Sequence, residues 1–356
     1  MTNQKISGRS SGFNPQNRFE EITLVPSDDD SRFFPDEDKT EQKVETKFYV
    51  DSSKTALAKN DSPDVGFTYS INPYRGCEHG CIYCYARPSH EFLGFSSGLD
   101  FETKIMVKED APELIRQVFM KKNWEPQVVA MSGNTDCYQP VERKLKITRR
   151  CLEVFLEFRN PVGIVTKNFL ITRDLDILAE LAKLQLVSVA ISITSLNQDL
   201  TKKMEPRTSS PAKKLEAIEL FSKNSIPVGV LVAPVIPGLT DEEIPSILRE
   251  VSLRGATFAG LQMVRLPYAV KDLFADWVRR EFPDRENRII SRIRDVRKGK
   301  MNSSEFKERM RGTGETAKAI HQLFYMTCKK YHLGNGKFDL ATDKFRRPVG
   351  MQMEMF

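Results

Sequence analysis

The chain has 356 residues, 40% of them hydrophobic, and a formal net charge of +6. This is enough for one large domain or two modest ones. No window approaches 18 uninterrupted apolar residues, and the first residues lack the apolar segment of a signal peptide, so we expect a cytoplasmic protein that does not engage a membrane. Six cysteines in a chain of this length do not make a disulfide scaffold.

Acidic residues dominate the first segment of the chain. Residues 1–64 carry 13 Asp or Glu against 9 Lys or Arg, and few of their apolar side chains are clustered. This composition predicts a partly disordered acidic leader. Within it, Phe33, Phe34 and the FYV sequence at 48–50 are expected to dock onto the body of the protein.

Apolar runs alternate with helix-period segments between residues 65 and 282. This alternation predicts an α/β domain with a parallel sheet covered by helices. An additional strand is expected outside the repeat, at residues 100–107. The repeating strands are expected at 66–71, 127–131, 162–166, 186–194, 227–233 and 258–264, and the helices at 111–122, 142–158, 171–184, 211–224, 240–253 and 270–282.

Two parallel topologies fit six such units: a doubly wound sheet, and a barrel that is closed or incomplete. Polar sequences follow strand after strand, and a site built from many consecutive loops is typical of the carboxyl-end face of a barrel rather than of one crevice. Six units rather than eight predict an incomplete (β/α)6 TIM-like barrel that is open on one side. The polar sequences are CEHGCIYC, SGNTD, TKN, SITS, PVIPG and RLP.

The C-terminal segment is basic. Residues 271–347 carry 20 Lys or Arg against 11 Asp or Glu, and helical patterns continue beyond residue 283. We therefore expect residues 283–356 to form a basic, mainly helical extension with an irregular tail. An excess of this kind attracts polyanions, although a solvated helix face is the alternative. The candidate phosphate contacts are Arg292, Arg294, Arg297, Lys298 and Lys300.

Three cysteines lie close together in the sequence NPYRGCEHGCIYCYARPSH. Cys77, Cys81 and Cys84 have the spacing C-x3-C-x2-C. A structural zinc ion needs four ligands, and His79 or His90 could supply the fourth. The alternatives are a [4Fe–4S] cluster held at three corners with its fourth iron open, and unligated thiols. The spacing favours the open cluster, because structural zinc sites draw two ligands from a second, distant segment.

With aromatic Tyr83 before the third cysteine, this motif resembles that of the radical S-adenosylmethionine (SAM) superfamily. Together with SGNTDCYQPVE, MEPRTSSPAKKL and APVIPGLTDEE, it resembles the branch related to spore photoproduct lyase, over about residues 60–334. The resemblance implies an incomplete barrel, a [4Fe–4S] cluster and S-adenosyl-L-methionine. It also implies a one-electron donor such as ferredoxin or flavodoxin, and reductive cleavage of SAM to a 5′-deoxyadenosyl radical that takes a hydrogen atom from a substrate.

The same resemblance assigns SAM contacts. Ser132, Gly133, Asn134 and Asp136 fall at the superfamily's methionine-binding motif, with an ordinary turn as the alternative. Ser192 and Thr194 alternate along a strand and are expected to face the interior. The remaining expected contacts are Glu205, Arg207 paired with the SAM carboxylate, residues 235–238 and Leu266 near the adenine, and the backbone of Tyr83, while Lys167 and Asn168 are substrate-side candidates.

Cys137 is a separate candidate. The lyase returns a hydrogen atom from a cysteine, but matching its S-C-T-S-D sequence to residues 132–136 puts Gly133 at that position. Cys137 is then either a replacement hydrogen donor or a packed structural thiol. This departure counts against thymine-dimer repair. We therefore predict a radical SAM enzyme with a nucleic-acid substrate, and keep as alternatives a protein or metabolite substrate and a non-catalytic metal-binding module.

Overall fold

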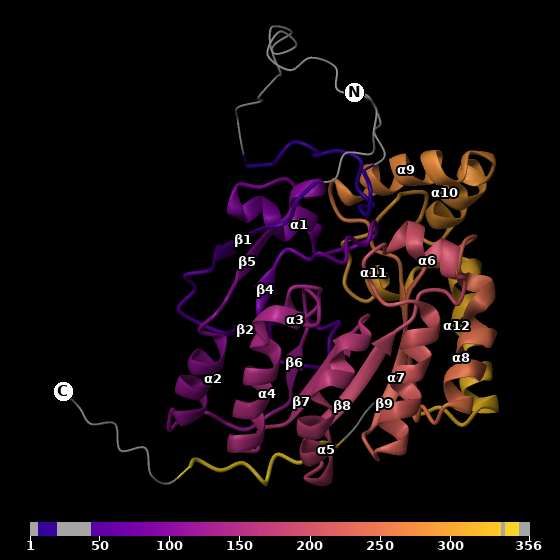
Figure 1. The fold of residues 1–356 in the computed structure, drawn as a ribbon. Coiled ribbons are helices and arrows are strands. Elements are labelled where there is room, and N and C mark those ends of the chain that lie inside the picture. Colours follow the sequence, from indigo (N-terminus) through magenta and orange to yellow (C-terminus); the bar gives the residue numbers. More distant parts are fainter. Residues whose placement is uncertain (1–5, 20–43, 336–338, 349–356) are drawn as a thin grey trace, which may run out of the picture.

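A computed structural model describes residues 6–19, 44–335 and 339–348, so Phe33 and Phe34 lie outside the described residues. Its centre is a seven-stranded sheet in the order β10-β9-β8-β7-β6-β3-β2 (Figure 1). All neighbours pair in parallel except β2 (Leu57–Lys59), which is antiparallel to β3. The six parallel strands are β3 (Tyr69–Ile71), β6 (Val129–Met131), β7 (Val162–Thr166), β8 (Val187–Ser192), β9 (Val228–Val235) and β10 (Phe258–Met263).

These six strands are those that the apolar runs predict, in sequence order across the sheet. Within the described part of the chain β10 does not pair with β2, so the sheet does not close on itself. The prediction of an incomplete (β/α)6 arrangement is therefore confirmed as an open parallel α/β fold.

Helices follow the strands and cover the sheet. They are α2 (Ala111–Met120), α4 (Ile147–Phe158), α5 (Leu175–Lys183), α7 (Pro211–Lys223), α8 (Ile244–Leu253) and α9 (Val270–Glu281). The helix expected at 142–158 is interrupted, because Lys146 adopts a left-handed φ of 53° between α3 (Glu142–Leu145) and α4. The helix expected at 171–184 begins instead as a 3-10 turn, Phe169–Asp174.

The core lies between the sheet and these helices. Ile164 and Val189 on the strands pack in one buried cluster with Phe155 of α4, Leu178 of α5 and Ile218 of α7. Burying each such side chain stabilises the fold by roughly 1.5–3 kcal/mol relative to leaving it in water. The helical spacing of the apolar residues thus fixes which face of each helix meets the sheet.

A second, three-stranded sheet lies beside the cysteine segment. It has the order β1-β5-β4, with β1 (Lys47–Val50) parallel to β5 (Lys104–Val107) and β4 (Tyr74–Arg75) antiparallel to it. The strand expected at 100–107 is therefore only β5, and the residues before it form the short helix α1 (Leu99–Thr103). Residues 48–50, expected to dock, do so as strand β1.

The C-terminal segment is helical as expected. It contains α10 (Glu286–Asp295), α11 (Glu308–Arg311) and α12 (Gly314–Lys330), and α12 lies beside α8 at the β10 end of the sheet (Figure 1). Among the described residues, no helix is both long and apolar enough to cross a bilayer.

Candidate active site

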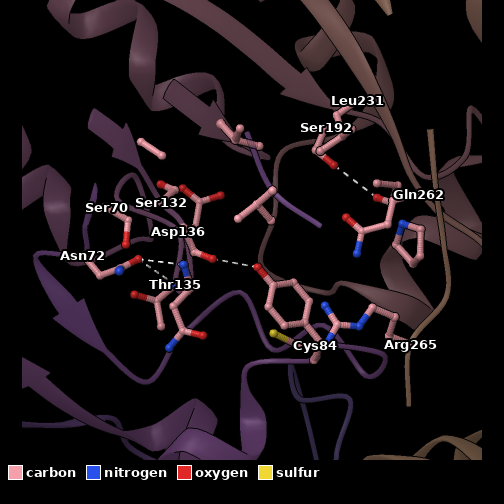
Figure 2. A pocket seen from close by; sticks show the side chains of 18 of the residues that line it. Ser70, Asn72, Cys84, Ser132, Thr135, Asp136, Ser192, Leu231, Gln262 and Arg265 are labelled. Carbon is pink, nitrogen blue, oxygen red and sulfur yellow. Dashed lines mark hydrogen bonds between the residues drawn. The ribbon is translucent and has the colours of Figure 1, made fainter. Parts of the chain in front are cut away.

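The carboxyl ends of the parallel strands surround a cavity of about 640 Å³ (Figure 2). Its walls include Met131 and Ser132 after β6, Ser192 at the end of β8, and Gln262 and Met263 of β10. The polar sequences that follow successive strands therefore converge, as the barrel interpretation predicts. The volume falls within the range of small-molecule and cofactor sites.

Cys77, Cys81 and Cys84 all line this cavity, and none forms a disulfide. Backbone contacts fix their loop from both sides: the Cys77 amide donates to the Phe101 carbonyl at 2.9 Å, and the Ile82 amide to the Met204 carbonyl at 2.9 Å. Gly80 has a left-handed φ of +64°, which the tight turn between the first two cysteines requires. The three cysteines, close in sequence, therefore all lie in the lining of one cavity.

The donor set fits an iron–sulfur cluster. Burial raises the pKa of all three thiols, and for Cys77 the carboxylate of Asp136 adds to the effect, so their thiolates need metal cations for stability. Iron–sulfur clusters are held by cysteine thiolates, and each thiolate would bind a separate iron atom at one corner. The three thiols of the cavity lining therefore suit a cluster bound at three corners.

Neither histidine considered as a fourth ligand offers a free nitrogen to the cavity. Both ring nitrogens of His79 have protein partners: Nδ1 lies 3.4 Å from Asp136 and Nε2 3.0 Å from the Asn168 amide. His90 is outside the cavity lining and packs against Phe95 and Phe101. Burial lowers the pKa of His90 to about 4, so its ring is neutral.

The predicted methionine-binding sequence lies on the wall opposite Arg265 and Gln262 (Figure 2). Ser132, Gly133, Asn134 and Asp136 all line the cavity. Asp136 is already engaged, since it accepts from the Thr166 hydroxyl at 2.7 Å and the Lys167 amide at 2.8 Å. Burial alone would raise the pKa of Asp136, but His79 and the Lys167 amide hold that pKa below the usual range, so Asp136 is an anion that holds the loop.

A buried ionic network lies behind the end of β8. The Lys167 ammonium donates to Ser192 at 3.0 Å and to Thr194 at 2.9 Å, and lies 3.2 Å from the carboxylate of Glu205. Glu205 also contacts Tyr83 and Lys214, and the two lysines lower its pKa to about 2 despite its burial. Lys167, Ser192 and Tyr83 line the cavity, whereas Thr194 and Glu205 are not among its lining residues.

Besides Thr194 and Glu205, three more predicted site residues are not brought to the cavity. Arg207 lines a separate surface pocket of about 290 Å³, where its guanidinium lies 3.3 Å from Glu78. Leu266 is fully buried in an apolar cluster with Tyr83. Cys137 is fully buried in the main core, which matches the packed-thiol alternative.

The structure also adds residues that the sequence did not single out. Arg87 is fully buried under the cysteine loop and pairs with Glu102 at 2.6 Å. The N-terminal segment 6–19 covers this region, where the Ser10 hydroxyl donates to the Gly80 carbonyl. Gly98 allows the close approach, because a Cβ there would lie 2.2 Å from the Phe13 carbonyl oxygen. On the cavity side, Lys59, Tyr85, Arg265 and Arg309 contribute to the lining.

A family model described as "Radical SAM superfamily" matches residues 71–251, which include the three cysteines and the whole of four of the six parallel strands, β6 to β9. The chain belongs to the radical SAM superfamily. It is 33% identical over 262 residues to an uncharacterised protein of Mycobacterium tuberculosis, covering 72% of this chain and 76% of that one. An uncharacterised protein of Methanocaldococcus jannaschii is 29% identical over 200 residues, or 56% of this chain and 73% of its relative.

Solved radical SAM structures share the fold. Spore photoproduct lyase complexed with dinucleoside spore photoproduct matches with a TM-score of 0.57 at 16% identity, covering 81% of this chain and 80% of the lyase. A variant of that lyase with bound AdoMet and the same dinucleoside gives a TM-score of 0.58 at 16% identity, covering 82% and 81%. As a radical SAM enzyme, the protein uses a [4Fe–4S] cluster and SAM, and it needs an electron donor.

Proposed function

We propose that Cys77, Cys81 and Cys84 hold the [4Fe–4S] cluster and that SAM occupies the cavity in front of them, where a hydrogen atom is taken from a nucleic-acid substrate. The observation that carries the proposal is the presence of three free thiols in the lining of one cavity at the carboxyl ends of the strands. The chemistry supplied by cluster and SAM when bound is reductive cleavage to methionine and a 5′-deoxyadenosyl radical.

The protein's own residues bind and orient. We assign the side chain of Asn134 and the backbone around Gly133 to the methionine end of SAM, because they lie on the cavity wall with their loop held by Asn72. Ser192, which is held by a hydrogen bond from Lys167, is assigned to a polar group of SAM near the end of β8.

The nucleic-acid assignment rests on the cavity rim. Lys59, Arg265 and Arg309 supply positive charge there, and Phe67 and Tyr85 supply aromatic surface. Cationic side chains with interleaved aromatic rings are typical of proteins that bind single-stranded nucleic acid. The fold neighbour bound to a dinucleoside supports the same class of substrate.

The basic C-terminal segment contributes less than its sequence predicts. Arg297 is buried and donates to the carbonyls of Val264 and Glu308, so it is a structural residue and cannot reach a phosphate. Lys298 pairs with Glu308 at 2.6 Å. Arg292, Arg294 and Lys300 are exposed, and we retain them as phosphate contacts outside the cavity.

The remaining assignments concern the cellular setting. We propose a ferredoxin or flavodoxin as the one-electron donor and a cytoplasmic location. Reduced thiols support the location, since cysteines remain reduced in the cytosol and none of those in the structure is in a disulfide.

Anaerobic reconstitution with iron and sulfide tests the catalytic part. We expect a brown protein that releases 5′-deoxyadenosine when given SAM and dithionite, whereas a colourless zinc protein that releases none would contradict it. For the substrate, we expect binding to DNA or RNA that weakens steeply with salt. Absence of salt-sensitive binding at low ionic strength would exclude nucleic acid and leave a protein or metabolite, to be found by profiling a deletion strain.

A further inference from the structure

Arg265 follows β10, the last strand of the sheet, and enters the cavity from the wall opposite Asn72 and Thr135 (Figure 2). In the described part of the chain its guanidinium donates to no carboxylate or carbonyl oxygen. Its contacts are the Met310 thioether at 3.6 Å and the ring of Tyr85, whose centroid lies 5.1 Å away. A thioether is a weak acceptor, so most of the donors of this guanidinium are available to a ligand.

The surrounding charges do not neutralise Arg265. Arg309 lines the same cavity, and its own guanidinium is taken by Asp64 at 2.5 Å and Ser62 at 2.6 Å. Asp64 also accepts from the Lys307 amide, and among the described residues it forms no hydrogen bond or ion pair with Arg265. The two arginines therefore have one nearby carboxylate between them, which leaves a net positive charge on this wall of the cavity. Burial and the nearby Arg309 lower the pKa of Arg265, and this effect exceeds the opposing one of Tyr85 and Asp64.

Arg297 is a buried arginine whose two terminal nitrogens have backbone acceptors, although its Nε has none among the described residues. Arg297 donates to the carbonyl oxygens of Val264, Glu308 and Arg309. An arginine held in a cavity without such acceptors is suited to a planar anion, because its donors form a fork that matches phosphate or carboxylate oxygens.

We propose that Arg265, with Arg309 beside it, is the site that recognises a phosphate of the substrate. This inference rests on the proposed function and deepens it, since it names the group by which the substrate is held. Tyr85 connects this site to the reaction centre: it adjoins Cys84 in sequence, and its hydroxyl donates to the Gly133 carbonyl at 2.7 Å. A phosphate on Arg265 would therefore bring the attached nucleoside next to the cysteine loop.

The test compares Arg265→Gln with Arg249→Gln, which removes the same charge from an exposed site on α8. Binding of a labelled single-stranded DNA of about 12 nucleotides is measured on the reconstituted proteins by anisotropy. We expect Arg265→Gln to weaken binding by about tenfold and to reduce the salt slope by about 1. Arg249→Gln should bind like the wild type. Arg265→Lys should recover part of the affinity, because it restores the charge without the fork.

Three further measurements separate the possible outcomes. SAM affinity and substrate-free release of 5′-deoxyadenosine should be unchanged in Arg249→Gln; in Arg265→Gln, a loss of SAM affinity with unchanged DNA binding would assign Arg265 to the SAM carboxylate and overturn the proposal. Binding of inorganic phosphate or AMP to the wild type but not to Arg265→Gln, without binding of DNA, would support the phosphate site and indicate a small phosphorylated substrate. If no phosphate-bearing probe binds the wild type while 5′-deoxyadenosine is still released, the phosphate site is wrong and the radical SAM activity stands.

Discussion

Two arginines lie near the cysteine loop in opposite environments. Arg87, outside the loop, is fully buried and donates to the carbonyls of Gly80, Cys81 and Gly98 as well as to Glu102. Arg265, inside the cavity, has only a thioether acceptor among the described residues. The guanidinium of Arg87 has protein acceptors for its donors without a ligand, whereas that of Arg265 does not. The contrast separates the part of the site that holds its shape from the part that receives a substrate.

The loop between these two regions gives the largest expected effect. Cys81→Ala removes one of the three thiolates, so we expect loss of the cluster and of 5′-deoxyadenosine release while the circular dichroism spectrum stays unchanged. Cys151→Ala is the matched control, because Cys151 is buried in the core away from the cavity and should leave both properties intact. Normal turnover in Cys81→Ala would show that the ligand assignment is wrong.

The outer region is tested by Arg87→Met. Removing this guanidinium leaves the buried Glu102 carboxylate unpaired, which should lower the free energy of unfolding by about 3–5 kcal/mol. Arg116→Met is the control, because Arg116 pairs with Glu157 at the same 2.6 Å but with 23% and 30% of the two side chains exposed. That surface pair should contribute less than about 1 kcal/mol. Equal losses in urea unfolding would contradict the distinction.

Gly80→Ala should have an intermediate effect. The substitution strains a backbone with φ +64° and places a Cβ 2.6 Å from the Glu102 carboxylate. Gly299→Ala has a comparable φ of +82° but no atom within 4 Å, so the difference between the two isolates the contact. We expect Gly299→Ala to cost roughly 1 kcal/mol of unfolding free energy and Gly80→Ala more, with reduced iron content per protein. Similar iron content in both variants would contradict the role of Gly80.

The smallest expected change in stability is that of Arg265→Met. Because Arg265 has no strong hydrogen bond or ion pair to lose, its free energy of unfolding should stay within about 1 kcal/mol of the wild type. A loss as large as that of Arg87→Met, measured by the same urea titration, would mean that Arg265 is a structural residue.

Local patterns predicted most of the fold, and they are also the basis of the proposed cluster ligands. The strand predicted from the apolar run 162–166 has the same bounds as β7, because a buried strand is recognisable from consecutive apolar side chains. The spacing of Cys77, Cys81 and Cys84 needs no tertiary information either. By contrast, Lys146 interrupts a helix without any Gly or Pro signal, because a left-handed residue there lets α3 and α4 pack separately.

Contacts distant in sequence explain what the sequence could not predict. The basic run around Arg297 predicts a phosphate contact, but its guanidinium donates to carbonyl oxygens of residues distant in sequence, such as Val264. Arg207 follows the helix α6 (Gln198–Met204) rather than a strand, and its side chain turns toward Glu78 outside the cavity. The role of Arg265 depends on missing partners, which only the three-dimensional arrangement reveals.

The central claim is that three thiolates hold the cluster and leave one iron to SAM. Mössbauer spectra of protein reconstituted with 57Fe, recorded with and without SAM, test it most directly. We predict that the signal of one iron site in the cluster changes when SAM is added and that the signals of the other three do not. Spectra that SAM leaves unaltered, or a protein that takes up zinc and no iron, would contradict the account.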